Sequence, residues 1–181
     1  DFYSNKCPNS AFFNRLHLGR QLHKEDKNDM ITIDTATVDD ILEFSKNIRS
    51  MDAKEVEFVS GKPFNDHLGF LLTHVEDVRT IKCDSVLLGI GNWYQEQLDW
   101  GLYSPGVVGW MLLTNEVEDH KIEFLRWSKE LVKTLLEAYP SITNVVDSRN
   151  LLHVQYLDFL GAKSWEDPFR KDIWHHIIER S

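Results

Sequence analysis

The sequence predicts a mixed α/β (α+β) domain in which helices cover both faces of one β-sheet. Three observations lead to this prediction. An amphipathic helix is expected from Asp119 to Tyr139, an apolar strand from Val107 to Leu113 precedes it, and short strand patterns alternate with helical ones elsewhere. The predicted element order is β-α-α-β-β-β-α-β-α-β-β, after an N-terminal extension.

The composition narrows the class of protein. The chain has 181 residues, of which 42% are hydrophobic, so one domain with a sizeable core is expected. Its 20 basic and 29 acidic residues give a net charge of -9, and a general nucleic-acid binder needs the opposite balance. We therefore expect no nucleic-acid partner. No apolar run approaches the roughly 20 residues that span a bilayer, and the polar first thirty residues predict no signal peptide.

Residues 1–29 are predicted to be an N-terminal extension, and residues 30–181 the domain. The extension is polar and holds no β-branched residue, but Phe12 and Phe13 form a short apolar patch. Two interpretations stay open, a flexible tail or an arm that binds a partner through these two side chains. Such an arm cannot bury enough apolar surface alone to offset its ordering entropy, and we favour a neighbouring subunit as its binding surface.

The first strand is predicted at 30–34. Thr37 is placed to cap the helix that follows, because Asp40 lies three residues on and completes an approximate capping box. A second helix is expected from 51 to 59 and ends at Gly61, and Pro63 begins a third short helix, which we count with the second.

The middle of the chain is predicted to be β-structure, with strands at 79–83 and 86–90. Gly89 and Gly91 indicate a bulge or a close backbone approach in the second of these strands. A loop from 92 to 105 then carries four large aromatic side chains, which either cap the end of the sheet or form a partner-binding surface. They are Trp93, Tyr94, Trp100 and Tyr103.

The apolar run at 107–113 is typical of a central strand buried on both faces, so Trp110 and Leu112 are expected in the core. Leu125, Val132 and Leu136 of the long helix should pack on that strand. A strand follows at 142–146, then a helix from about 149 to 160 that Asp147 or Ser148 would cap and Gly161 would end. Two strands, at 163–165 and 172–178, complete the order.

The last third of the chain resembles the GNAT fold of the N-acetyltransferase superfamily. Asn150 begins an apolar helix and Gly161 follows it eleven positions later, as in that family's fourth-helix segment. More narrowly, the chain is similar to a phage branch that includes the internal virion protein A of T7-like podophages. This likeness rests on Tyr139-Pro140, on Asn144-Val145-Val146 and on the early segment Arg49-Ser50-Met51-Asp52 with Glu55. It covers about residues 30–178 and implies a GNAT-like mixed sheet flanked by helices.

Two family features are altered. The resemblance implies a glycine-rich pyrophosphate loop between the central strand and the long helix, where backbone N–H groups approach the phosphates. Here the junction holds no glycine and three carboxylates, Glu116, Glu118 and Asp119, between Asn115 and Lys121. The family's acid is a Tyr seven residues after the Asn, but Leu157 stands there and Tyr156 is its neighbour.

We therefore expect no cofactor and a catalytically degenerate phage protein that binds proteins within the virion or in the host cytoplasm. The alternative is an active N-acetyltransferase that uses acetyl-CoA, with Glu116, Tyr156 or Asp147 as acid or base. A third possibility is that the acidic surface mimics a nucleic acid and inhibits a host enzyme.

No metal site is predicted from the histidines and cysteines. His175 and His176 alternate on a strand and point to opposite faces, and His67 with His74 lacks further ligands. His153 is interpreted as a satisfied core or interface residue. The two cysteines, Cys7 and Cys83, are expected to be inert thiols of a reduced compartment.

Overall fold

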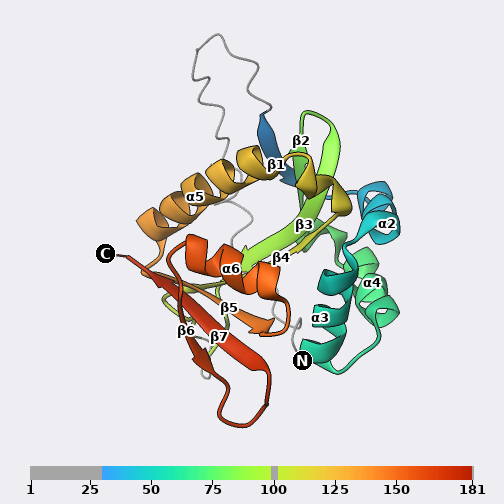
Figure 1. The fold of residues 1–181 in the computed structure, drawn as a ribbon. Coiled ribbons are helices and arrows are strands. Elements are labelled where there is room, and N and C mark those ends of the chain that lie inside the picture. Colours follow the sequence, from blue (N-terminus) through green and yellow to red (C-terminus); the bar gives the residue numbers. More distant parts are fainter. Residues whose placement is uncertain (1–29, 99–101, 181) are drawn as a thin grey trace.

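The computed structural model describes residues 30–98 and 102–180 (Figure 1). Its centre is a seven-stranded mixed sheet with the strand order β1-β2-β3-β4-β5-β7-β6. Neighbouring strands are antiparallel, except that β4 and β5 run parallel. The strands are β1 (Ile31–Thr35), β2 (Arg79–Cys83), β3 (Val86–Tyr94), β4 (Val107–Leu113), β5 (Ser141–Asp147), β6 (Lys163–Glu166) and β7 (Ile173–Glu179).

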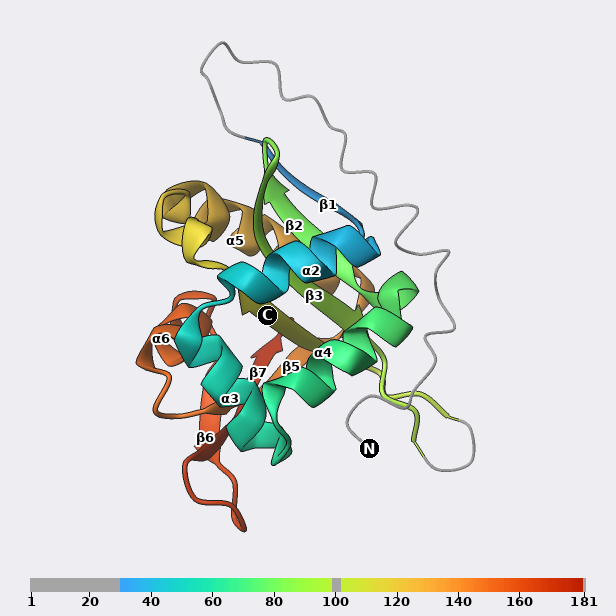
Figure 2. The same ribbon diagram turned by 90° about the vertical axis from the view of Figure 1, so that its right-hand side faces the viewer.

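Helices cover both faces of this sheet, as predicted. Figures 1 and 2 show α2, α3 and α4 on one side and α5 and α6 on the other. The predicted order of helices and strands is confirmed. The helices are α2 (Val38–Asn47), α3 (Ser50–Ser60), α4 (Phe64–Thr73), α5 (Lys121–Ala138) and α6 (Leu151–Phe159), with short 3-10 helices η1 (Val75–Asp77) and η3 (Asn115–Glu118). No helix among the described residues is long and apolar enough to cross a membrane.

Local sequence signals explain several helix ends. Thr37 and Asp40 form the predicted capping box at the start of α2, with reciprocal side-chain to backbone hydrogen bonds. Gly61 ends α3 in the left-handed conformation at φ 69°, which favours glycine. The cap predicted for α6 is wrong, because Asn150 accepts the backbone N–H of His153 there, whereas Asp147 binds Arg149.

The core has two parts, one on each face of the sheet. On α5 the fully buried side chains are Phe124, Ser128, Leu131 and Leu135. The predicted contacts Leu125, Val132 and Leu136 lie beside this line and are only half-buried. On β4 the strand is less completely covered than predicted, since Trp110 and Leu112 are also half-buried and pack against the α2–α4 side.

β3 is longer than predicted and continues to Tyr94, so the aromatic loop begins later than expected. The register of β2 and β3 shifts between Ile81 and Lys82, which confirms an irregularity beside Gly89. A Cβ atom at Gly89 would lie 2.5 Å from the carbonyl oxygen of Leu112, so the close backbone approach is also present.

Candidate functional site

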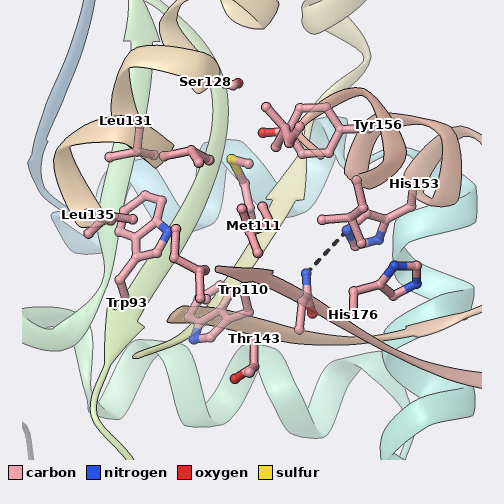
Figure 3. A pocket seen from close by; sticks show the side chains of 17 residues that line it. Trp93, Trp110, Met111, Ser128, Leu131, Leu135, Thr143, His153, Tyr156 and His176 are labelled. Carbon is pink, nitrogen blue, oxygen red and sulfur yellow. Dashed lines mark hydrogen bonds between the residues drawn. The ribbon is translucent and has the colours of Figure 1, made fainter. Parts of the chain in front are cut away.

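A wedge opens in the sheet where β4 and β5 diverge. The two strands pair only through Val107 and Val108 with Ile142 and Thr143. Beyond these pairs, side chains from β4, β5, β7, α5 and α6 fill the wedge and leave a cavity of about 50 Å³ (Figure 3). A larger groove of about 290 Å³ adjoins it between the first turns of α5 and the length of α6. His153, Tyr156 and Met111 line both spaces, so the candidate site is centred on them.

The open edge of β4 is occupied by the chain itself. The buried carboxylate of Asp52 accepts the backbone N–H of Leu113 at 2.8 Å. The backbone N–H of Arg49 donates to the carbonyl oxygen of Leu113 at 3.0 Å. A strand edge that leaves its neighbour exposes backbone groups that need partners. Here the start of α3 supplies these partners for Leu113.

Asp52 is also the first member of a buried polar network. Its carboxylate accepts two hydrogen bonds from the Arg49 guanidinium, the shorter at 2.8 Å. Asn150, which is 1% exposed, donates to Asp52 and, through a shorter contact, to Glu55. Both carboxylates are therefore buried with partners, as buried charges must be. The network ties α3 to β4 and to the start of α6.

Glu55 and His153 form a carboxylate–histidine pair. The Nδ1 atom of His153 lies 2.8 Å from the Glu55 carboxylate, and an ionised carboxylate only accepts, so Nδ1 carries the proton. The side-chain amide nitrogen of Asn144 lies 3.4 Å from Nε2 of the same ring (Figure 3, dashed line), and because an amide nitrogen only donates, Nε2 is the acceptor in this contact. Such a pair orients a general base in many enzymes, but here Nε2 faces an amide of the same chain.

Tyr156 lies where the wedge meets the groove. Its ring stacks on Phe124 with the ring centroids 5.7 Å apart. Burial raises the pKa of the Tyr156 phenol well above its ordinary value, and a hydrogen bond with Ser128 opposes this shift only in part. Tyr156 therefore keeps its proton at neutral pH. The residue at the family's acid position, Leu157, is buried in the wall of the same wedge.

His176 is a second histidine in the wedge. It is 1% exposed, and its Nδ1 atom lies 2.7 Å from the hydroxyl of Ser164. Among the described residues, nothing hydrogen-bonds to its buried Nε2 atom. Burial, helped by the nearby His153, lowers the pKa of His176 to about 4. His175 points to the opposite face, as predicted, and pairs with Asp167 at 2.9 Å.

The junction before α5 is rich in exposed carboxylates. Residues 115–118 form η3, where Glu116 and Glu118 are exposed, and Asp119 follows, also exposed. Asn115 donates to the carbonyl oxygen of Asn47 at 3.1 Å, and Glu118 lies 4.0 Å from the Arg49 guanidinium. Lys121 lines the groove as the first residue of α5. The three carboxylates lie within five residues of Lys121 in the sequence, and their negative charge would disfavour a pyrophosphate group at this junction.

The other two candidate acid–base residues do not reach the wedge. Asp147 lies at the end of β5 and takes a two-point salt bridge from Arg149, with contacts at 2.7 and 2.8 Å. Burial would raise the pKa of Asp147, but the hydrogen bonds from Arg149 outweigh it and hold this pKa below its ordinary value. Neither Asp147 nor Glu116 lines the cavity or the groove, so the structure brings only Tyr156 to the site.

The predicted partner-binding aromatics differ in exposure. Trp93 is 6% exposed and packs in the core beside Gly109, so its assignment to a contact surface is wrong. The sequence predicts that β3 ends at residue 90, whereas the strand continues to Tyr94 and so includes Trp93. Tyr94 is half-buried, and Tyr103 is 38% exposed and forms an isolated bridge with Gln97. Trp100, Phe12 and Phe13 lie outside the described residues.

Sequence reasoning missed most of the polar network. Asp52 and Glu55 lie three residues apart on α3, and Arg49 precedes Asp52 by three residues at the N-cap, a spacing that could have marked them as a group. His153, interpreted as a satisfied residue, is indeed hydrogen-bonded, but at the centre of the site. No group of three or more His, Cys, Asp and Glu residues is placed to hold a metal ion within 30–98 and 102–180.

Three solved structures with the same fold are distant from this chain in sequence. An acetyltransferase of the GNAT family from Bacillus anthracis has a TM-score of 0.59 at 9% identity, covering 84% of this chain and 96% of that one. Spermidine N-acetyltransferase from Vibrio cholerae, in complex with CoA and spermine, has a TM-score of 0.58 at 12% identity, covering 84% and 96%. A domain from Methanocaldococcus jannaschii has a TM-score of 0.58 at 16% identity, covering 83% and 99%. These likenesses show the GNAT fold.

Sequence comparison gives one family. The family described as "Bacteriophage T7, probable scaffold protein Gp13" matches residues 77–169, which is more than half of the chain. The match runs from the residues just before β2 to the loop between β6 and β7 and includes the wedge strands and α6. No curated protein matches the chain significantly.

Proposed function

The chain belongs to the phage family described as "Bacteriophage T7, probable scaffold protein Gp13" and has an acetyltransferase-like fold, and on this premise we propose that it is a catalytically degenerate GNAT-fold protein. It serves as a rigid binding module, within the virion or on a host protein. A fold does not fix a function, and the proposal therefore rests on the site.

The observation that supports loss of catalysis is the contact of Asp52 with Leu113. This carboxylate, held by Arg49, occupies the edge of β4 beside the groove. A ligand that paired with this part of the strand edge would have to displace a buried charge and leave it without partners, which costs several kcal/mol. The carboxylates of Glu116, Glu118 and Asp119 act in the same direction, because they repel a phosphate ligand at the start of α5.

Thermal denaturation with acetyl-CoA tests this proposal. A ligand that binds only the folded chain stabilises it by about 2.7 kcal/mol at 100 times its dissociation constant. We expect no shift of the midpoint with acetyl-CoA at millimolar concentration, and calorimetry on the same sample should show no binding heat. A saturable shift would overturn the proposal. Mass spectrometry of purified particles tests the virion role, for which we expect the chain at a fixed copy number.

The alternative, an acetyl-CoA-dependent N-acetyltransferase, is favoured by one observation. Tyr156 lines the wedge and keeps its proton, as a general acid must. If this alternative holds, release of free CoA from acetyl-CoA in the presence of amines should be measurable. The variant Tyr156→Phe should then lower the turnover rate and leave acetyl-CoA binding nearly unchanged.

A further inference from the structure

The loop between β6 and β7 presents one phenylalanine to solvent. Phe169 is 93% exposed, the highest value among the large hydrophobic residues that the structure describes. An isolated exposed apolar residue is common and needs no explanation by itself. Phe169 differs from such isolated residues in that hydrogen bonds within its loop hold the backbone in place.

Asp167 organises the loop around Phe169. Its carboxylate accepts the backbone N–H groups of Phe169 and Arg170, both at 2.9 Å, and a hydrogen bond from Nε2 of His175 at 2.9 Å. The Arg170 side chain adds a salt bridge to the same carboxylate at 3.3 Å. Four groups thus converge on one side chain. A loop that is already ordered loses little entropy when it binds, so Phe169 is preorganised for a contact.

The groove between α5 and α6 has the complementary shape and chemistry. Its volume of about 290 Å³ exceeds the roughly 150 Å³ that suffices for a benzene molecule. Apolar side chains dominate its lining. Its charged lining residues are Arg49, Asp52, Glu118 and Lys121, of which Glu118 and Lys121 are exposed at its rim. Two more exposed carboxylates, Glu116 and Asp119, flank Glu118 in sequence.

The loop and the groove cannot meet within one copy. Arg49 and Asp52, at the start of α3, line the groove, whereas Arg170 of the loop lies against the carbonyl oxygen of Val59 near the end of α3. The eleven residues of α3 span roughly 16 Å. Figure 1 shows the loop at the lower end of the molecule, away from the start of α5. The Asp167 hydrogen bonds keep the loop there.

We infer that Phe169 of one copy inserts into the α5–α6 groove of a second copy, with the exposed Lys171 beside Glu118 at its rim. This contact joins two different surfaces and is therefore heterologous, so it builds rings or open chains rather than closed pairs. The inference rests on the proposed function, because the groove is free for a protein only if acetyl-CoA does not hold it. It names the partner of that site as another copy of the chain.

The test uses full-length chains and sedimentation velocity over a concentration series. The wild-type chain should self-associate, and Phe169→Ala should raise the dissociation constant at least tenfold, as expected for the loss of a central aromatic anchor. On the other surface, Leu152→Glu should have the same effect because Leu152 lines the groove. Leu151→Glu is the matched control, since Leu151 is also exposed on α6 but does not line the groove.

Mixing the two disrupted variants separates this contact from others. The Phe169→Ala chain keeps its groove and the Leu152→Glu chain keeps its phenylalanine, so together they should form a heterodimer that grows no further. A charge reversal tests the contact of Lys171 with Glu118. The variant Lys171→Glu should weaken association, and adding Glu118→Lys to the same chain should restore it. Circular dichroism of each variant confirms that it is folded.

Three results would overturn the inference. The first is a wild-type chain that stays monomeric over the whole concentration series, and the second is a set of variants that associate as the wild type does. The third is association that is lost in the double variant Phe12→Ala, Phe13→Ala but kept in Phe169→Ala, because the N-terminal extension would then be the occupant of the groove. Acetyl-CoA calorimetry on the same samples tests the proposed function separately, so the two failures are distinguishable.

Discussion

Asp52 and Leu113 are 61 residues apart in the sequence, yet the Asp52 carboxylate accepts the Leu113 backbone N–H at 2.8 Å. The bond closes the edge of β4 where that strand leaves β5. Because Arg49 and Asn150 donate to the same carboxylate, one buried charge connects three segments of the chain. The stability of the wedge should therefore depend on Asp52.

Replacing Asp52 with alanine should lower the free energy of unfolding by about 3 kcal/mol, since it leaves the buried N–H of Leu113 and the half-buried guanidinium of Arg49 without their acceptor. Urea denaturation measures this loss. Asp39→Ala on α2 is the control, because Asp39 is exposed and should change the free energy by less than about 0.5 kcal/mol. A loss below about 1 kcal/mol for Asp52→Ala would mean that the network does not hold the wedge together.

Leu135 should be the most sensitive position of α5. It is 1% exposed and belongs to the core on the α5–α6 side, so Leu135→Ala should cost about 2–5 kcal/mol of unfolding free energy. The adjacent Leu136 is half-buried, and Leu136→Ala should cost clearly less. Denaturant titration of both variants compares the two losses and so tests which face of α5 points into the core. Equal losses would show that the two side chains are equally buried.

The acidic junction should respond to redesign. Replacing Glu116 and Asp119 with glycine and Glu118 with arginine removes three negative charges and lets a phosphate approach the backbone more closely. Calorimetry should then show that the variant binds CoA more tightly than the wild type. A variant with glutamine at all three positions separates the loss of charge from the gain of glycine. Unchanged affinity in a folded variant would argue that the start of α3, rather than the junction, prevents binding.

The buried histidines should make stability depend on pH. The pKa of His176 is about 4 in the folded chain and about 6.5 when unfolded, so the unfolded chain binds more protons between these values. The stability contributed by a neutral His176 is present above pH 6.5 and is lost as the pH falls toward 4, by up to about 3 kcal/mol. His176→Gln should flatten this part of the curve of unfolding free energy against pH.

A second histidine contributes in the same direction. Burial lowers the pKa of His67 as well, so the wild-type slope contains both shares. The control His67→Gln should remove only the contribution of His67 to this slope and leave the contribution of His176 in place. If His176→Gln leaves the slope unchanged, then His176 is protonated in the folded chain without cost.

Local sequence determined the helices and strands of this protein. The Thr37–Asp40 capping box, the glycine after α3 and the apolar periodicity of residues 119–139 act over a few residues, so they predicted the element order correctly. The carboxylates before α5 are likewise a property of one short segment. The prediction that they disfavour a phosphate ligand therefore needs only the sequence.

Tertiary structure alone decided which distant residues meet. The pairing of Glu55 with His153 spans 98 residues, and no local pattern fixes which side chains face each other across α3 and α6. The register shift beside Gly89 interrupts the strand pattern of β3 in the sequence. The sequence therefore predicts a loop at Trp93, whereas β3 continues and carries Trp93 into the core. The site depends on where β4 and β5 separate. Beyond Val107 and Val108 the edge of β4 is paired instead with the distant Asp52, and this contact between remote segments is not encoded in the sequence of either strand.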